Sequence, residues 1–319
     1  LLNKKARFDA VFDENAAQAD IYEKVGKEAF LAAQRGYRSS LIAYGVSGSG
    51  KTHTMDGDLG DRSQNKWGLI PRILNEVFAF GKTCEDFVCT LQYVQIYLER
   101  IEDLGVESQG TVQASRGGKK AGLQVEVRGT ADNQEITASK HVLSTYNEAI
   151  DFYVKASHRR AVGNNAQNLV SSRSHAMLIV TFEWTDSSAG AGASASSKGV
   201  LNLVDLAGSE RLKALPVGLR QEEFLTITKN LTHLSLCIDI MVKNATKPNA
   251  ARSVPVRGSK LTHLLAPCFS GRGAINVIIT ALNGASDVGD ADESLEFGKR
   301  CLKLPIELVR QGVSVKSGV

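Results

Sequence analysis

The chain has 319 residues, of which 43% are hydrophobic and 23% are charged. This composition excludes a disordered or fibrous protein, and the length is sufficient to bury one large core. Its net charge of +4 is uneven, because the stretch from Ile240 to Ser286 holds six Lys or Arg and no Asp or Glu. Such a basic stretch suggests a surface that faces a polyanion, although a solvated face is the ordinary interpretation.

Short runs rich in Val, Ile and Leu alternate with segments of helical period, which predicts an α/β fold around a central mixed sheet. The predicted strands are Phe8–Phe12, Ser40–Ala43, Phe87–Tyr97, Met177–Trp184, Val200–Val204 and Ala274–Ala281. Between the fourth and fifth strands, the low-complexity stretch 186–199 is expected to be a flexible surface loop. No repeat or linker divides the chain, so we expect a single domain over residues 1–319.

The composition also bears on compartment and partners. The longest apolar run, around Ala274 to Leu282, is less than half of what a membrane-spanning helix needs, and no signal segment opens the chain. The five cysteines show no CxxC spacing, so we expect buried free thiols rather than a zinc site or disulfides. These features predict a soluble, intracellular protein without a membrane partner.

The strongest local motif is GVSGSGKT, Gly45 to Thr52, which fits the phosphate-binding pattern G-x-x-x-x-G-K-[ST]. It follows an apolar run and precedes a predicted helix, an order that an accidental Gly/Ser turn would not show. Backbone N–H groups and the helix dipole would bind phosphate, Lys51 would neutralise the β and γ phosphates, and Thr52 would contact Mg²⁺. The predicted nucleotide-binding residues in this loop are Gly45, Ser47, Gly48, Ser49, Gly50, Lys51 and Thr52.

Two further segments have the character of γ-phosphate sensors. Asn168–His175, with sequence NLVSSRSH, gathers small hydroxyls and one Arg before a predicted strand, although a polar loop would have the same composition. Leu203–Arg211, with sequence LVDLAGSER, places an Asp and a Gly after a buried strand. Asp205 could hold magnesium through water, and the N–H of Gly208 could approach the γ-phosphate because no side chain intervenes.

Taken together, in this order and at these separations, the three segments resemble the kinesin motor family. The likeness covers essentially the whole chain and includes FDAVF at Phe8, QADIYEKV at Gln18, LQYVQIYLERIEDL at Leu91, VPVRGSKLTHLL at Val254 and ESLEFGKR at Glu293. It implies a P-loop NTPase fold of kinesin motor type, with helices on both faces of a central mixed sheet. It also implies a cytoplasmic, microtubule-associated ATP hydrolase that binds ATP or ADP with Mg²⁺.

The resemblance also assigns roles to individual residues. Asn168–His175 would be switch I and Asp205–Glu210 the core of switch II, with Ser174 and Asp205 beside Thr52 at the magnesium. Arg173 would pair with Glu210 when the switches close over the γ-phosphate, and that closure would organise the attacking water together with Ser174 and Gly208. His53 occupies the position where the family packs a side chain against adenine, although a surface role is equally compatible with a lone His.

A long helix is predicted from Glu222 to Asn244. Its core stripe is Phe224, Ile227, Leu231, Leu234, Ile238 and Met241. The opposite face carries Lys229, His233, Leu236, Ile240 and Lys243, where exposed apolar residues among charges indicate either a partner or a neighbouring helix. In the family this helix docks on acidic tubulin, with Arg257, Lys260 and His263 beside it. We therefore expect microtubules as the partner and no nucleic-acid ligand, with any oligomerisation arising outside this chain.

Several positions depart from the family pattern. Val46 stands where Gln is usual, and Thr228 and Asn230 replace the usual Asn and Ser. Three residues of the basic segment, Val256, Gly258 and His263, replace Tyr, Asp and Arg, which should weaken microtubule binding. The segment from Glu210 to Gly218 looks short, the chain begins after the family's RxRP strand, and residues after Lys303 match a neck linker poorly.

These departures favour a rival interpretation, a kinesin-like protein that binds nucleotide or microtubules with little hydrolysis. Against it, the three motifs retain every residue that the chemistry would need. A regulatory GTPase is a weaker alternative, because its guanine-binding N-K-x-D element is missing from the sequence.

Overall fold

The computed structural model describes residues 7–61, 64–106, 125–131, 134–162, 172–186, 193–210, 221–284, 288–306 and 308–317. Its strands are β1 (Arg38–Tyr44), β2 (Glu85–Tyr97), β3 (Arg100–Asp103), β4 (Val127–Gly129), β5 (Gln134–Ile136), β6 (His141–Leu143), β7 (His175–Asp186), β8 (Ala193–Asp205), β9 (Gly273–Ile279) and β10 (Gln311–Ser317). Its α-helices are α1 (Gln18–Ile21), α2 (Lys27–Gln34), α3 (Lys51–Met55), α4 (Leu69–Gly81), α5 (Tyr146–Val162), α6 (Gln221–Thr246), α7 (Lys260–Leu264) and α8 (Val288–Cys301).

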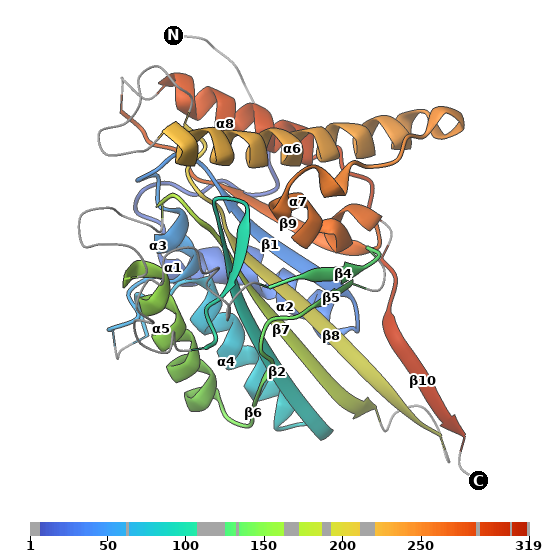
Figure 1. The fold of residues 1–319 in the computed structure, drawn as a ribbon. Helices are drawn as coiled ribbons and strands as arrows, with labels where there is room; N and C mark the ends of the chain where they lie inside the picture. The colour runs from blue at the N-terminus through green and yellow to red at the C-terminus, as the bar shows by residue number, and fades with distance from the viewer. Residues whose placement is uncertain are drawn as a thin grey trace, which may run out of the picture.

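A mixed eight-stranded sheet passes through the centre of the molecule (Figure 1). Six strands follow the order β3-β2-β7-β8-β1-β9, and β10 and β6 pair with β8 and β2. Strand β1 is parallel to both β8 and β9. Strand β7 is antiparallel to both β2 and β8. The mixed sheet predicted from the sequence is confirmed.

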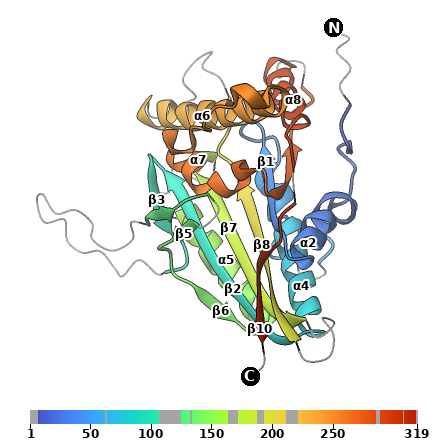
Figure 2. The ribbon, with the colours of Figure 1, turned by 90° about the vertical axis from the view of Figure 1, so that its right-hand side faces the viewer.

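Helices cover both faces of this sheet (Figures 1 and 2). One core cluster packs α2, α4 and α5 against the sheet and is centred on fully buried side chains such as Leu74, Leu178 and Tyr153. The other packs α6, α7 and α8 against the opposite face, where Tyr44 of β1 stacks on Phe297 of α8 with ring centroids 3.9 Å apart. This three-layer arrangement confirms the fold class.

Helix α6 has the predicted core stripe. All six stripe residues are buried, with exposed fractions between 1% and 9%: Phe224, Ile227, Leu231, Leu234, Ile238 and Met241. The spacing of three and four residues keeps them on one side of the helix, over the sheet. The remaining face is therefore left toward solvent.

The strand predicted at Phe8–Phe12 is wrong, because this segment is irregular and pairs with no described strand. Phe8 packs against α8 instead of entering a ladder, whereas Val11 is 81% exposed. A Cβ added at Gly298 in α8 would lie 2.9 Å from the Phe8 ring, which shows how closely the ring approaches that helix. Apolar alternation alone cannot distinguish a strand from such a packing segment.

The flexible loop predicted at residues 186–199 also needs correction. Strand β8 begins at Ala193, and its early residues pair with β7 on one side and β10 on the other. Ladder hydrogen bonds come from the backbone, so small Ala and Ser residues can extend a strand when partners flank it. Residues 187–192 of the predicted loop lie outside the described part.

Candidate nucleotide-binding site

The topology brings the three sequence motifs to one edge of the sheet. Parallel strands β1 and β8 both end there, at Tyr44 and Asp205, so the loops that follow them are neighbours. Antiparallel β7 begins at the same edge, where Ala176 pairs with Asp205. The phosphate-binding loop and the two switch-like segments therefore meet although they are far apart in the sequence.

The loop Gly45–Thr52 has the backbone conformation that its glycines predict. Gly48 and Gly50 have φ angles of 78° and 102°, in a region that side chains with a Cβ disfavour. Ser49 shares a hydrogen bond of 2.6 Å with Thr280, whose own N–H donates to Tyr44 O. Thr280, which follows β9, thus supports the loop from its other side and was not identified from the sequence.

Lys51 is folded back onto its own loop. Its Nζ donates to the carbonyl oxygens of Gly45 and Val46 at 2.9 and 2.8 Å, and the residue is 6% exposed. Burial lowers the pKa of Lys51, and the carboxylates of Asp205 and Glu210 act in the opposite direction. A cation in this position is ready to exchange its carbonyl partners for phosphate oxygens.

The three predicted magnesium residues come together. Thr52 Oγ1 donates to Asp205 Oδ2 at 2.8 Å, and Ser174 is buried beside them. Asp205 Oδ1 is buried and has no hydrogen-bond partner among the described residues. A carboxylate oxygen without a partner next to two hydroxyl oxygens is a donor set that suits a hydrated Mg²⁺. The residues present therefore fit the predicted metal.

Arg160 in α5 belongs to this cluster and was missed from the sequence. Its guanidinium donates to Asp205 Oδ2 at 2.6 Å, to Ser174 O at 3.0 Å and to Ser174 Oγ at 3.4 Å. Burial acts to lower the pKa of Arg160, but the Asp205 carboxylate raises it, so the group stays charged. Ala149, Tyr153 and Ala156 precede it at core-stripe spacing, and an Arg that continues such a stripe was the available signal.

Gly208, in the second predicted switch, contacts the first one. Its N–H, predicted to approach the γ-phosphate, donates to Ser172 O at 3.0 Å. A side chain at this position would collide with the Glu210 carboxylate and the Ser47 hydroxyl. The close approach therefore requires glycine. Nearby, Ala207 N–H donates to His175 Nδ1 at 3.0 Å, and burial, Arg160 and Lys51 lower the pKa of His175 to about 3.

Arg173 and Glu210 have different partners in this structure. Glu210 accepts hydrogen bonds from the N–H and hydroxyl of Ser47 at 3.0 and 2.7 Å. Arg173 instead pairs with Glu223 of α6, with Nη1 to Oε2 at 3.2 Å. The predicted pair belongs to a closed arrangement of the switches, and it stays a prediction. Residues 168–171 and 211–220 of the predicted segments, including the shortened stretch, lie outside the described part.

His53 lies on the surface in the middle of α3. Gln18 Nε2 donates to His53 O at 2.7 Å and lies 3.2 Å from His53 Nδ1, so α1 contacts α3 here. The exposed ring is available to a ligand, and its role toward adenine stays a prediction.

A half-buried acid close to this site, Asp56, gives a prediction for stability. Tyr153 OH donates to Asp56 Oδ1 at 2.5 Å, and burial raises the pKa of Asp56 from 3.8 to about 6. As pH rises, the Asp56 carboxyl ionises at a lower pH in the unfolded chain than in the folded one. The free energy of unfolding therefore falls between pH 3.8 and about 6. Asp56→Asn should therefore raise the free energy of unfolding at pH 7.5 by up to about 2 kcal/mol, and by much less at pH 4. Urea unfolding at both pH values measures this.

Asp58→Asn is the matched control, because Asp58 is an exposed carboxylate two residues further along the chain. It should leave the pH dependence unchanged. A curve of stability against pH for Asp56→Asn that ran parallel to the parent curve would contradict a raised pKa at Asp56.

The predicted partner-facing residues lie on and beside α6. Lys229, Lys243, Arg257 and Lys260 are exposed, and His263 is half-buried. Burial lowers the pKa of His263, and the neighbouring Arg257 and Lys260 lower it further. His263 is therefore mostly neutral at pH 7. Leu236 is 42% exposed on this face, whereas Ile240 is half-buried.

A hollow of about 520 Å³ lies at the start of α6. Glu99 from the β2–β3 turn borders it, and Glu99 Oε2 lies 3.6 Å from Lys229 Nζ. Leu225, which is 55% exposed, adds an apolar side chain to its wall.

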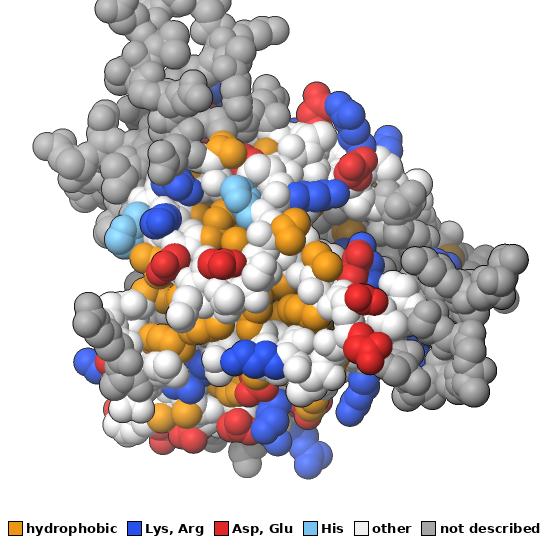
Figure 3. Space-filling view, turned by 90° about the horizontal axis from the view of Figure 1, so that it is seen from below, with side chains coloured by type: hydrophobic (Ala, Val, Ile, Leu, Met, Phe, Trp, Pro, Cys, Tyr) orange, Lys and Arg blue, Asp and Glu red, His pale blue; other side chains and the backbone are white. Residues whose placement is uncertain are grey.

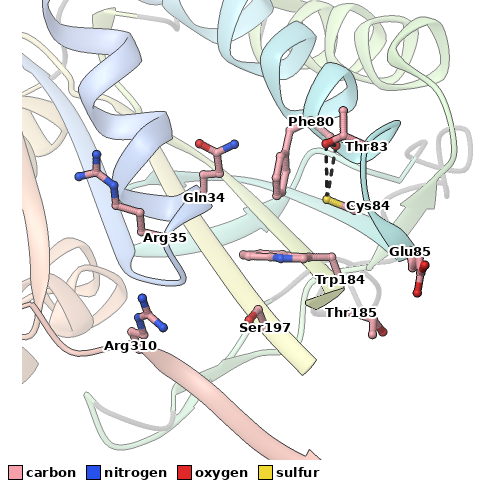
Figure 4. A pocket seen from close by; sticks show the side chains of 10 residues that line it. All are labelled: Gln34, Arg35, Phe80, Thr83, Cys84, Glu85, Trp184, Thr185, Ser197 and Arg310. Carbon is pink, nitrogen blue, oxygen red and sulfur yellow. Dashed lines mark hydrogen bonds between the residues drawn. The ribbon is translucent and has the colours of Figure 1, made fainter. Parts of the chain in front are cut away.

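The end of the molecule away from α6 and α8 shows acidic and basic side chains mixed with apolar ones (Figure 3). A separate cleft of about 430 Å³ lies between the ends of α2 and α4 and strands β7 and β8 (Figure 4). Phe80 and Trp184 form its aromatic wall, with Arg35 and Arg310 opposite. None of the site residues predicted from the sequence lines this cleft.

Two predictions about general character can be compared with the structure. All five cysteines are free, and Cys89, Cys237 and Cys268 are buried, while Cys84 and Cys301 are half-buried. Within the described ranges, no helix combines the length and the apolar character needed to cross a membrane.

Comparison with known proteins agrees with this geometry. The model of the kinesin motor domain family matches residues 2–304. Kinesin-like protein KIN-14N of Oryza sativa subsp. japonica is 33% identical over 315 residues, which cover 97% of this chain and 39% of that protein. The chloroplastic kinesin-like protein KIN-7M of Arabidopsis thaliana is 31% identical over 309 residues, covering 96% and 27%.

A solved structure of a fast kinesin superposes with a TM-score of 0.78 at 26% identity, covering 96% of this chain and 81% of that one. The chain spans less than half the length of the two curated relatives. With the family model matched across nearly the whole chain, the sequence resemblance is confirmed: the chain belongs to the kinesin motor domain family.

Proposed function

We propose that this domain hydrolyses Mg·ATP and couples closure of its switches to microtubule binding. One observation carries the proposal: Thr52, Ser174 and Asp205 converge beside the phosphate-binding loop, and Asp205 Oδ1 is buried without a hydrogen-bond partner in the described part of the chain. Family membership supports a microtubule motor, and the fast kinesin structure was interpreted in terms of an ATPase mechanism and interactions with microtubules.

The nucleotide would be held by the loop and by Lys51. Releasing Lys51 Nζ from its two carbonyl acceptors frees a charged donor for the β and γ phosphates. Thr52, Ser174 and Asp205 would hold Mg²⁺, which when bound neutralises charge that develops on the phosphates. Arg160, whose guanidinium donates to Asp205 Oδ2, fixes the orientation of the Asp205 carboxylate.

Hydrolysis would depend on Arg173 and Glu210 meeting over the γ-phosphate. Glu210 already lies above the loop, on Ser47, so it must leave one set of donors and accept another. The pair would act mainly in the transition state, by positioning the attacking water. Gly208 N–H would contribute once it leaves Ser172 O.

The partner surface would be the exposed face of α6 with the basic segment beside it. Its exposed cations, Lys229, Lys243, Arg257 and Lys260, suit the acidic surface of tubulin. Leu225 and Leu236 add exposed apolar area, which a protein partner covers better than a phosphate backbone does. The proposed location is therefore the microtubule cytoskeleton.

Reversing Lys243, Arg257 and Lys260 to Glu should eliminate cosedimentation with microtubules. Each position is exposed, so the change removes attraction and adds repulsion without altering the core. Parent binding should also be strongly salt-sensitive, because charges dominate the encounter. Pelleting assays at low and moderate salt measure both effects. A triple variant that pelleted like the parent would place the contact surface elsewhere.

The reverse change provides a second arm of this test. His263→Arg adds a permanent charge where burial keeps the imidazole neutral, so it should tighten binding at low salt. Charge reversal at Lys82, an exposed residue that follows α4 and lies outside this face, is the control and should leave pelleting unchanged.

A second function is favoured by one observation. Arg173 and Glu210 each have another partner in this structure, which is what a nucleotide-binding relative without turnover would also show. Such a protein would bind ATP and ADP through Lys51 but would release no phosphate with or without microtubules.

A further inference from the structure

Arg173 is held by a second carboxylate in a largely buried ion pair. Glu223 Oε2 lies 3.2 Å from Arg173 Nη1, and the two side chains are only 6% and 12% exposed. Such a pair is costly to break when one charge would be left buried. The Arg173 guanidinium therefore has two alternative carboxylate partners. It pairs with Glu223 in this structure, and it would pair with Glu210 in the proposed hydrolysis step.

Tyr97 fixes Glu223 in this position. The Tyr97 hydroxyl, at the end of β2, donates a hydrogen bond to Glu223 Oε1, the oxygen that does not face Arg173. Tyr97 leads into a two-residue turn at Leu98 and Glu99, where both residues have positive φ angles, 49° and 56°. Side chains disfavour this backbone region, so a two-residue turn without glycine is held by its surroundings.

The same turn touches the partner-facing surface. Glu99 Oε2 lies 3.6 Å from Lys229 Nζ and accepts from the backbone N–H of Lys260 at 3.3 Å. Glu223 and Lys229 lie on one helix, α6, about 9 Å apart along its axis. The tip of β2 and β3 lies beneath this helix (Figure 2). A partner that moved α6 relative to the sheet would therefore change the Glu223 contacts.

We propose that Glu223, supported by Tyr97, is a positioning residue that holds Arg173 away from Glu210, so that a shift of α6 on its partner releases Arg173 for switch closure. This inference rests on the proposed function and adds how the partner surface controls the nucleotide site. On closure, Glu210 leaves Ser47 and Arg173 leaves Glu223, and the two freed side chains form one new pair.

The test is the affinity for a non-hydrolysable ATP analogue relative to ADP, because closure favours the ligand that carries a γ-phosphate. Glu223→Gln keeps the shape and an acceptor for Tyr97 but removes the charge. It should tighten analogue binding relative to ADP by about 3- to 10-fold, the size of one charge-assisted hydrogen bond. Basal ATP turnover should rise by a similar factor, and stimulation by microtubules should fall correspondingly.

Three further variants keep the interpretation specific. In a Glu210→Ala background, Glu223→Gln should have no effect, because Arg173 has no second carboxylate to reach. Tyr97→Phe should act in the same direction as Glu223→Gln but more weakly. Asp239→Asn is the control, since it removes another carboxylate of α6 that pairs with an Arg, here Arg300 of α8 at 3.5 Å. It should change neither the affinity ratio nor the basal turnover.

Each outcome is decisive. An unchanged or lowered affinity ratio in Glu223→Gln, with both ligands still bound, would overturn the positioning role alone. An equal rise of the affinity ratio in Asp239→Asn would also overturn the positioning role, because a general loosening of α6 would then explain both results. A parent protein that bound neither ligand would overturn the proposed function and this role with it.

Discussion

Replacing Lys51 by Ala should nearly abolish binding of Mg·ATP and Mg·ADP. In this structure the ammonium group makes two hydrogen bonds of 2.9 and 2.8 Å to loop carbonyls, which places it where phosphate oxygens would arrive. Removing two charge-assisted hydrogen bonds to phosphate should weaken binding by roughly 100-fold or more. Titration with a fluorescent ADP analogue measures the change.

Lys82→Ala is the control for this titration, because Lys82 is an exposed lysine directly after α4 and lies in neither proposed site. Its affinity should equal that of the parent. If the analogue bound Lys51→Ala as tightly as the parent, the phosphate site would have to lie elsewhere in the molecule.

Arg173→Ala and Glu210→Ala should each lower kcat by about 100-fold while leaving the affinity for ADP largely intact. The reason is that the pair forms only on closure, as their separate partners Glu223 and Ser47 show. The double variant should be no slower than the slower single variant, because the two residues act as a unit. Steady-state turnover and analogue titration together separate kcat from binding.

If the reduction of kcat in the double variant equalled the product of the two single reductions, the two residues would act independently and not as one ion pair. Preserved affinity for ADP in each variant shows that the fold is intact. This matters for Arg173→Ala, which also leaves the Glu223 carboxylate buried without its cation.

Much of the fold follows from periodicity in the sequence. The stripe residues from Phe224 to Met241 recur every three or four positions, and all six are buried, so the hydrophobic period correctly predicted which face of α6 packs on the sheet. The meeting of the loop after Tyr44 with Asp205 follows from parallel strands, whose carboxyl ends share an edge. Thr52 and Asp205 were therefore predictable as neighbours, whereas Ser174 was placed beside them by the family resemblance.

Other features depend on tertiary contacts that a single sequence does not display. Residues from Ala193 onward form a strand only because β7 and β10 supply ladder partners on both sides. Glu223 lies in the first turn of a helix, where acidic residues are common for reasons of the helix dipole. Nothing local distinguishes it from a solvated carboxylate, so its pairing with Arg173 emerged only from the structure.

Steady-state ATP turnover with and without microtubules tests the central claim most directly. The convergence of Lys51, Thr52, Ser174 and Asp205 predicts measurable basal turnover, and the basic face of α6 predicts that microtubules increase it. The increase should weaken as salt rises, since exposed charges bring the partners together. Phosphate release that stayed at background with and without microtubules, in protein that binds ADP, would contradict the proposed motor ATPase.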